Sequence, residues 1–311
     1  MTGWLLLTGA AALLVAGAEL FVENAAGAAR RLGVTVVAVG MLLAGAEPEE
    51  LLTAVIAAVQ DRPGLAAGDA VGANVTMLTA CLGLAAVVRP LTLGHRVRQY
   101  AVLSSVAGVL AVLVLLSGSV GRVEGALLVL AYVALVALVW WREKEPPALG
   151  ELAELAQDTD SDESTQRSPA VSLLLAVLGI ALMVGGGDLA VRGAVRVVDS
   201  LGRTDSAIGL TVLALATTAE LFALVLTAVR HAVPEIAVAG VVGSAAYNAT
   251  ATLGAAALAR PLVVDGVLPA AVAAAALPLV VLALAPAGRL GRPAGAALGA
   301  GYALYLVVVL R

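Results

Sequence analysis

Long runs of apolar residues fill most of the chain, and short polar stretches separate them. A helix that crosses a lipid bilayer needs about 20 mostly apolar residues. Ten runs reach this length, so the pattern predicts an all-α, polytopic membrane protein with about ten transmembrane helices. The predicted helices span residues 3–22, 33–58, 64–88, 98–118, 123–141, 170–191, 205–229, 234–258, 266–286 and 292–310.

One connection between the predicted helices differs from the others. Most connections are short and carry arginine or proline, whereas residues 142–169 contain eight acidic and three basic residues. This composition offers too little apolar surface for folding, so it predicts a disordered, acidic linker. The linker divides the chain into residues 1–141 and 170–311, with five predicted helices each. Arginine is more frequent in the loops on the linker's side, which predicts that the linker is cytoplasmic.

Composition strengthens the membrane interpretation. Hydrophobic residues make up 61% of the chain and charged residues 13%, whereas soluble globular proteins carry roughly 25% charged residues. A water-soluble fold would therefore lack polar surface. Soluble enzymes, nucleic-acid binders and disulfide-stabilised secreted domains are excluded, and Cys81 is the only cysteine. We expect a multi-pass protein of the cell membrane, either plasma or inner.

The two halves contain matching segments at nearly constant spacing. Five helices per half is an odd number, so the second half must enter the membrane from the opposite side. This arrangement is the inverted-topology repeat of many secondary transporters, whose substrate site lies near the membrane midplane where the halves meet. The matches pair residues 17–22 with 186–191 (offset 169), 50–51 with 220–221 (offset 170), and 70–73 with 241–244 (offset 171).

Acidic residues inside the predicted helices need an explanation. A charge at the bilayer centre costs about 2.5–3.5 kcal/mol on insertion scales. No lysine or arginine lies deep enough in a predicted helix to neutralise these residues. Carboxylates without basic partners are suited to bind Ca²⁺ or Na⁺, or to carry protons. The seven candidates are Glu19, Glu47, Glu49, Glu50, Asp69, Asp188 and Glu220.

Spacing selects a smaller set of predicted cation ligands. Residues three or four apart share one face of a helix, as Glu47 and Glu50 do in the second predicted helix. Gly45 and Pro48 lie among these residues and could open the backbone, which would free carbonyl oxygens. The predicted ligands are Glu47, Glu50, Asn74, Thr217, Glu220, Ser244 and Asn248.

Other polar residues in the predicted helices have simpler interpretations. Threonines in membrane helices often only donate hydrogen bonds between helices, and we interpret Thr76, Thr79 and Thr250 in this way. Glu19 and Asp188 are interpreted as structural charges near helix ends. For Glu49, a role in the site and exposure to water both stay open.

Two pairs of segments resemble the α-repeats of the sodium/calcium exchangers, within the cation/calcium antiporter superfamily. Each repeat of that family has a Gly-Thr-Ser-Leu-Pro-Glu motif followed by Gly-Asn-Val-Val-Gly-Ser-Asn-Ile-Phe-Asn. The first half reads Gly-Ala-Glu-Pro-Glu-Glu at 45–50 and Gly-Asp-Ala-Val-Gly-Ala-Asn-Val-Thr-Met at 68–77. The second half reads Ala-Thr-Thr-Ala-Glu-Leu at 216–221 and Gly-Val-Val-Gly-Ser-Ala-Ala-Tyr-Asn at 240–248.

The resemblance implies an alternating-access antiporter that exchanges Ca²⁺, or a similar cation, for Na⁺. It places the essential glutamates at Glu50 and Glu220, and further ligands at Thr217, Ser244 and Asn248. The implied partners are inorganic cations and the lipid bilayer, with no cofactor and no nucleic acid.

The first half departs from the family pattern at three positions: Glu47 replaces a hydroxyl, Ala73 a serine and Met77 an asparagine. Because extra carboxylates can carry protons, a proton-coupled exchanger stays open.

Two alternatives belong to other functional classes. Residues 185–188 match the Gly-x-Gly-Asp motif of intramembrane aspartyl proteases, but that chemistry needs a second aspartate nearby. Asp69 lacks the partner motif, which argues against a protease. A non-transporting membrane scaffold fits the ligands lost from the first half, although the retained Glu50 and Glu220 argue against it.

Overall fold

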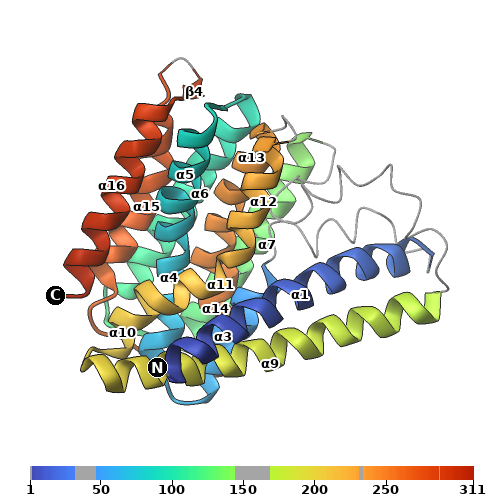
Figure 1. Ribbon diagram of the computed structural model, residues 1–311, viewed down its shortest axis with the longest axis vertical. Coiled ribbons are helices and arrows are strands. Elements are labelled where there is room, and N and C mark those ends of the chain that lie inside the picture. Colours follow the sequence, from blue (N-terminus) through green and yellow to red (C-terminus); the bar gives the residue numbers. More distant parts are fainter. Residues whose placement is uncertain (1, 32–46, 144–168, 231–233, 287) are drawn as a thin grey trace.

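The computed structural model describes residues 2–31, 47–143, 169–230, 234–286 and 288–311, and these are almost entirely helical (Figure 1). The predicted helical residues 33–46 and linker residues 144–168 lie outside the described residues. The first half contains α1 (Thr2–Arg31), α3 (Pro48–Val59), α4 (Pro63–Thr76), the π-helix η1 (Met77–Cys81), α5 (Leu82–Val88), α6 (His95–Leu115) and α7 (Arg122–Glu143).

The second half has an equivalent of each of these elements, in the same order. It contains α9 (Pro169–Leu201), α10 (Asp205–Ile208), the π-helix η3 (Gly209–Leu213), α11 (Ala214–Thr217), α12 (Ala219–Arg230), α13 (Pro234–Tyr247), the π-helix η4 (Asn248–Thr252), α14 (Leu253–Ala259), α15 (Leu268–Ala283) and α16 (Arg292–Val309). Within the described residues, six helices are long and apolar enough to cross a membrane. The predicted class, an all-α polytopic membrane protein, is confirmed.

Helices α1 and α9 show that the two halves are inverted. They occupy equivalent places in the two halves and pack along each other through small residues. Gly3 lies against Gly193, whereas Gly17 lies against Gly179, so the two helices run antiparallel. Both exceed the predicted lengths, with 30 and 33 residues. At 1.5 Å per residue the two helices reach about 45–50 Å, which is longer than the bilayer core. They run at a steep angle to α15 and α16 (Figure 1).

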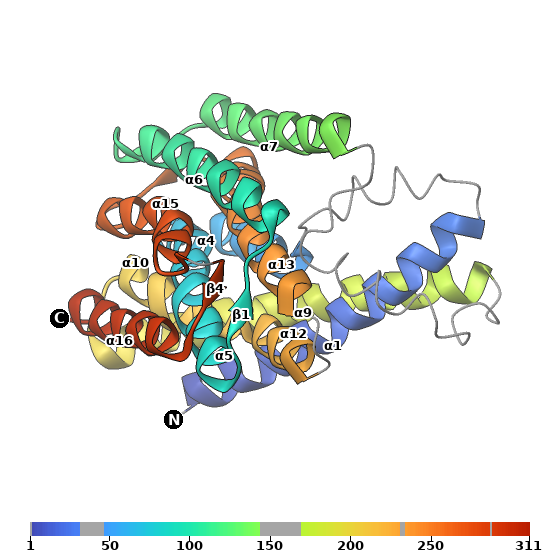
Figure 2. The same ribbon diagram turned by 90° about the horizontal axis from the view of Figure 1, so that it is seen from above.

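Two short strand pairs, absent from the predictions, join the halves. β1 (Leu91–Thr92) pairs with β4 (Arg289–Leu290), and β2 (Ser119–Val120) pairs with β3 (Leu262–Val263), both antiparallel. Figure 2 shows β1 and β4 side by side above the helices. Each pair satisfies backbone groups in the loops at a helix end, and each connects one half of the chain to the other.

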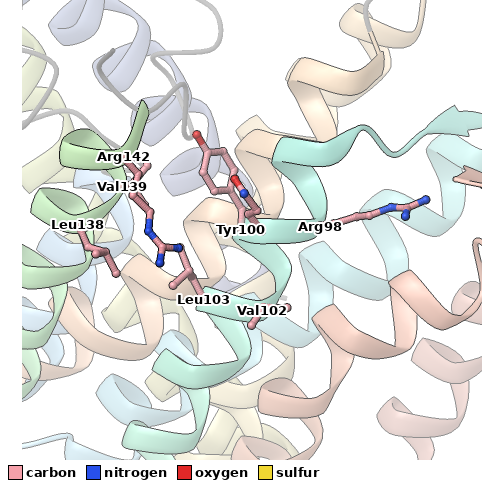
Figure 3. A pocket seen from close by; sticks show the side chains of 8 residues that line it. Arg98, Tyr100, Val102, Leu103, Leu138, Val139 and Arg142 are labelled. Carbon is pink, nitrogen blue, oxygen red and sulfur yellow. The ribbon is translucent and has the colours of Figure 1, made fainter. Parts of the chain in front are cut away.

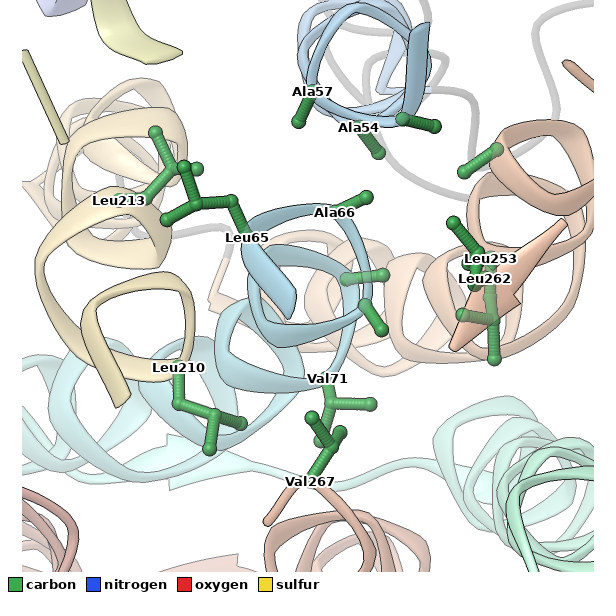
Figure 4. Close-up of a cluster of buried hydrophobic side chains, with 14 of the residues drawn as sticks. Ala54, Ala57, Leu65, Ala66, Val71, Leu210, Leu213, Leu253, Leu262 and Val267 are labelled. Carbon is green, nitrogen blue, oxygen red and sulfur yellow. The ribbon is translucent and has the colours of Figure 1, made fainter. Parts of the chain in front are cut away.

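Helix α4 lies at the centre of the core. Figure 4 shows its Leu65 directed toward Leu213 and its Val71 toward Val267, both from the second half. Two of its glycines permit close backbone contact. A Cβ on Gly72 would lie 2.4 Å from the Leu210 carbonyl oxygen, and one on Gly68 would lie 2.9 Å from the Gly209 Cα. Glycine therefore allows α4 to pack directly on η3.

Candidate cation site

Helix ends lie beside the acidic residues in both halves. In the first half, Pro48 occupies the first turn of α3 and Glu47 precedes it with a non-helical backbone. In the second half, α11 ends at Thr217 and α12 begins at Ala219, although the segment contains no proline or glycine. Thr218 separates them with φ −78° and ψ 6°. Buried helix ends present backbone groups that lack intrahelical partners, which suits them to bind ions.

The structure corrects the alignment of the two repeats. Helix α3 spans residues 48–59 and α12 spans residues 219–230, 171 residues later at both ends. The starts of α4 and α13, at residues 63 and 234, have the same offset. Glu49, rather than Glu50, is thus the repeat equivalent of Glu220. The predicted offset of 170 for this helix was wrong, because a single shared Glu-Leu pair cannot distinguish two adjacent glutamates.

Glu47 and Asn248 bring the two halves together in the site. The Asn248 side-chain amide donates to the Glu47 carboxylate at 3.4 Å, and the Thr252 hydroxyl donates to Asn248 Oδ1 at 3.0 Å. The Glu47 carboxyl group also lies beside the side chains of Glu50 and Ser244. Four of the predicted ligands, from α3, its preceding residue, α13 and η4, are therefore neighbours.

Thr217 faces a residue outside the predicted ligand set. Its hydroxyl lies 3.0 Å from Asp69 Oδ1, and also 3.3 Å from the Leu213 carbonyl and 3.2 Å from the Ala214 carbonyl. One hydroxyl proton serves only one of these acceptors at a time. Sequence spacing did not identify Asp69 because its partner lies 148 residues away.

Asn74 and Glu220 are the remaining predicted ligands. The Asn74 amide donates to the Ala245 carbonyl at 2.9 Å, and Ala245 is its repeat equivalent. Asn74 thus contributes to packing between the halves, while its Oδ1 has no hydrogen-bond partner in the described structure. Glu220 is buried in the first turn of α12, directly after the interruption.

Several buried oxygens in this region have no hydrogen-bond partner within the described structure. An unsatisfied buried polar group costs about 1–3 kcal/mol, and more when it is charged. No lysine or arginine is among the described buried residues, and Glu49 is only 2% exposed, so it does not face water. These oxygens are Glu47 Oε1, Glu49 Oε2, Glu50 Oε1 and Oε2, Thr53 Oγ1, Asp69 Oδ2, Asn74 Oδ1 and Ser244 Oγ.

Carboxylates alone do not complete a metal site here. Within the described residues, no three histidine, cysteine, aspartate or glutamate side chains group closely enough to hold a metal ion. A cation in this region would also need oxygens from hydroxyls, amides or backbone carbonyls. Such mixed oxygen ligands suit Ca²⁺ and Na⁺ better than transition metals.

Asp188 and Glu19 lie apart from this site. Asp188 pairs with Arg192 at 2.8 Å and accepts a hydrogen bond from Gln60 at 2.8 Å, while Glu19 is exposed. The prediction that no basic residue neutralises the acidic set was wrong for Asp188, because α9 continues to residue 201 and includes Arg192. An arginine partner also differs from the paired aspartates of a protease.

The threonines that we interpreted as links between helices divide into two kinds. Thr76 lies 3.4 Å from the Tyr302 hydroxyl of α16, which fits that interpretation. Thr79 and Thr250 instead donate to the carbonyls of Val75 and Ala246, four residues earlier in their own helices. For these two the interpretation was wrong.

A separate cavity of about 340 Å³ lies between α6 and α7. Figure 3 shows Arg142 directed toward Leu103 inside it, while Arg98 points away. None of the predicted ligands lines this cavity, so we do not include it in the candidate site.

Comparisons with known proteins point to one family. A family model described as "Sodium/calcium exchanger protein" matches residues 2–141 and 171–311. The "Putative antiporter CaxA" of Alkalimonas amylolytica is 30% identical over 258 residues, which cover 81% of this chain and 79% of that protein. The "Inner membrane protein YrbG" of Escherichia coli is 29% identical over 75% of this chain and 70% of that protein.

Solved structures share the fold. The sodium-calcium exchanger NCX_Mj has a TM-score of 0.63 at 21% identity and covers 98% of both chains. The H⁺/Ca²⁺ exchanger CAX has a TM-score of 0.72 at 15% identity and covers 98% of this chain and 80% of its own. At these identities the likeness supports the fold alone.

Proposed function

The chain belongs to the sodium/calcium exchanger protein family, and from this premise we propose that it exchanges Ca²⁺, or a similar cation, for Na⁺. Members of this family are multi-pass membrane transporters. We further propose a location in the cell membrane, plasma or inner, with residues 142–169 as a cytoplasmic linker between repeats 1–141 and 170–311.

One observation carries the proposal: helix ends from both halves bury carboxylates, and no lysine or arginine is among the described buried residues. In the first half, oxygens of Glu47, Glu49 and Glu50 also have no hydrogen-bond partner in the described structure. Ca²⁺ takes six to eight oxygen ligands, and this region offers carboxylate, hydroxyl and amide oxygens from α3, α4, α11, α12, α13 and η4. The proposed ligands are Glu47, Glu49, Glu50, Asn74, Thr217, Glu220, Ser244 and Asn248. Glu49 joins the set because it is the repeat equivalent of Glu220.

Alternating access requires part of the protein to move past the site. Helices α1 and α9 form a long pair that packs along one side of the bundle (Figure 1). Gly187 of α9 packs on Thr53 of α3, where an added Cβ would lie 3.1 Å from the Thr53 hydroxyl. We propose that this pair slides across α3 and α12 and exposes the site to each side in turn.

Proton coupling is the second candidate, because the buried carboxylates carry more negative charge than one Ca²⁺ neutralises. Glu47, Glu49, Glu50, Asp69 and Glu220 would carry five negative charges if all were ionised, and one Ca²⁺ supplies two positive charges. The excess must be neutralised by Na⁺ or by protons, since an uncompensated buried charge is costly.

Transport into proteoliposomes tests the proposal. We expect ⁴⁵Ca²⁺ uptake when an outward Na⁺ gradient is imposed, and its loss in Glu220→Gln. Uptake driven by a pH gradient and indifferent to Na⁺ would select the proton-coupled candidate. If neither gradient drives uptake of any tested cation, the antiporter proposal is wrong.

A further inference from the structure

Asp69 of α4 is a buried acidic residue that the proposed ligand set leaves out. Its exposure is 0%, and its Oδ1 accepts a hydrogen bond from the Thr217 hydroxyl at 3.0 Å. Its second oxygen, Oδ2, has no hydrogen-bond partner in the described structure. The side chain therefore presents an unsatisfied oxygen directly beside a proposed ligand from the other half.

The position of Asp69 on α4 matches a gap in the first repeat. Residues 69 and 73 lie four apart and share one face of the helix. At residue 73 the first half has alanine, where the second half has Ser244. The repeat equivalent of Asp69 is Gly240, which offers no side-chain ligand. Each half thus supplies one oxygen-bearing side chain on the equivalent helix face. Asp69 lies one helical turn before the position that is equivalent to Ser244.

Helix packing holds Asp69 firmly in this place. Gly68 and Gly72 flank it on α4 and contact the backbone of η3, which leads directly into α11 and Thr217. The backbone around Asp69 is thus fixed against the segment that ends at the helix interruption. Its carboxylate also lies near those of Glu49 and Glu50.

A neutral side chain would satisfy Thr217 equally well. The hydroxyl needs only an acceptor, which an asparagine oxygen provides without the cost of a buried charge. A carboxylate at this place gains its advantage only when a cation is present. Because Coulomb energy scales with the charge of the ion, the gain is larger for a divalent than for a monovalent cation.

We propose that Asp69 is a ligand of the transported divalent cation and replaces the side-chain oxygens that Ala73 and Met77 no longer supply. This inference rests on the proposed function of the same site. It assigns the selectivity for divalent cations in the first half to Asp69. This residue lies one turn before Ala73, whose repeat equivalent Ser244 is a proposed ligand in the second half.

Equilibrium binding of ⁴⁵Ca²⁺ to the purified full-length protein in detergent tests this inference without transport. In Asp69→Asn the acceptor for Thr217 remains and the charge is lost. We expect the Kd for Ca²⁺ to rise roughly tenfold or more, because ligand charge sets Ca²⁺ affinity. A lower Na⁺ concentration should displace Ca²⁺ from the variant, because losing the charge weakens Ca²⁺ binding more than Na⁺ binding.

Glu124→Gln is the matched control, because Glu124 is an exposed carboxylate in the first turn of α7, and its Kd should stay within about twofold of wild type. An unchanged Kd in Asp69→Asn would overturn the inference and leave the proposed function standing. If wild-type protein binds no Ca²⁺, the proposed function fails and this inference with it. Should Asp69→Asn not elute as a single species in size-exclusion chromatography, Asp69→Ser also removes the charge, with a smaller side chain, and the same criterion applies.

Discussion

Glu49 and Glu50 are adjacent in sequence and both buried, yet they differ in their relation to the second half. The helix bounds make Glu49 the equivalent of Glu220, whereas Glu50 corresponds to Leu221. The inverted fold gives equivalent residues equivalent places on either side of the site. Glu49 and Glu220 should therefore contribute similarly to cation binding, and Glu50 contributes a carboxylate that only the first half has.

We accordingly expect Glu49→Gln and Glu220→Gln to reduce ⁴⁵Ca²⁺ flux by similar factors, roughly 100-fold each. This factor corresponds to about 3 kcal/mol, the upper range for a hydrogen bond or ligand contact to a charged group. Flux measured in proteoliposomes checks it, with Glu124→Gln as the control. A large loss of flux in Glu50→Gln, together with near-normal flux in Glu49→Gln, would contradict the structural alignment. It would instead support the offset of 170, which pairs Glu50 with Glu220.

The sequence was informative about the chemistry of these residues and less so about their neighbours. Acidic residues in apolar helices can be recognised from composition alone, because their cost demands a reason. The contact between Asp69 and Thr217 depends on how α4 packs against α11, and no local pattern encodes it. The missing Cβ atoms of Gly68 and Gly72 are the one sequence signal for that packing.

Among the helices, the contact of α4 with η3 determines how the two halves meet. Gly72 allows this contact, since a Cβ there would lie 2.4 Å from the Leu210 carbonyl oxygen. A backbone carbonyl cannot move aside as a flexible side chain can. The site depends on this contact, because Asp69 and Thr217 lie next to it.

Gly72→Ala should therefore destabilise the protein, by about 1–3 kcal/mol as in other overpacked cores. Thermal unfolding of the purified protein in detergent should show a lower midpoint. Gly185→Ala is a suitable control because no atom lies within 4 Å of the corresponding Cβ position, and its midpoint should match wild type. Equal midpoints for Gly72→Ala and wild type would argue against tight packing of α4 on η3.

Several features at the scale of helices could be predicted, and others could not. Pro48 indicated where α3 begins, because proline lacks an amide hydrogen and favours the first helical turn. The interruption at Thr218 carries no such residue, and the fold imposes it. The π-helical segments η1 and η4 and the two strand pairs arise from contacts between the halves, so apolar run lengths contain no information about them.

For the whole molecule, the pair of α1 and α9 is connected to the rest by few polar contacts in the described structure. One of them joins Gln60, at the end of α3, to Asp188 of α9 at 2.8 Å. If α9 slides across α3 during transport, this contact must break in each cycle. A covalent link at the same place should stop the cycle.

We expect a protein with Gln60→Cys and Asp188→Cys, in a Cys81→Ala background, to lose flux after treatment with a short reagent that links two thiols through cleavable disulfides. Reduction should restore the flux, because the link and not the substitutions prevents the motion. Each single cysteine variant, treated in the same way, serves as the control. Full flux in the linked protein would contradict a sliding motion of α9 against α3.

The central claim is that the buried carboxylates of the two halves hold the transported cation. Anomalous diffraction from crystals soaked with Sr²⁺, a heavier ion that resembles Ca²⁺, tests it most directly. We predict an anomalous peak within coordination distance of the Glu49, Glu50 or Glu220 carboxylates, and its loss in crystals of Glu220→Gln. Peaks confined to exposed carboxylates, in a protein whose ⁴⁵Ca²⁺ flux is intact, would contradict this account.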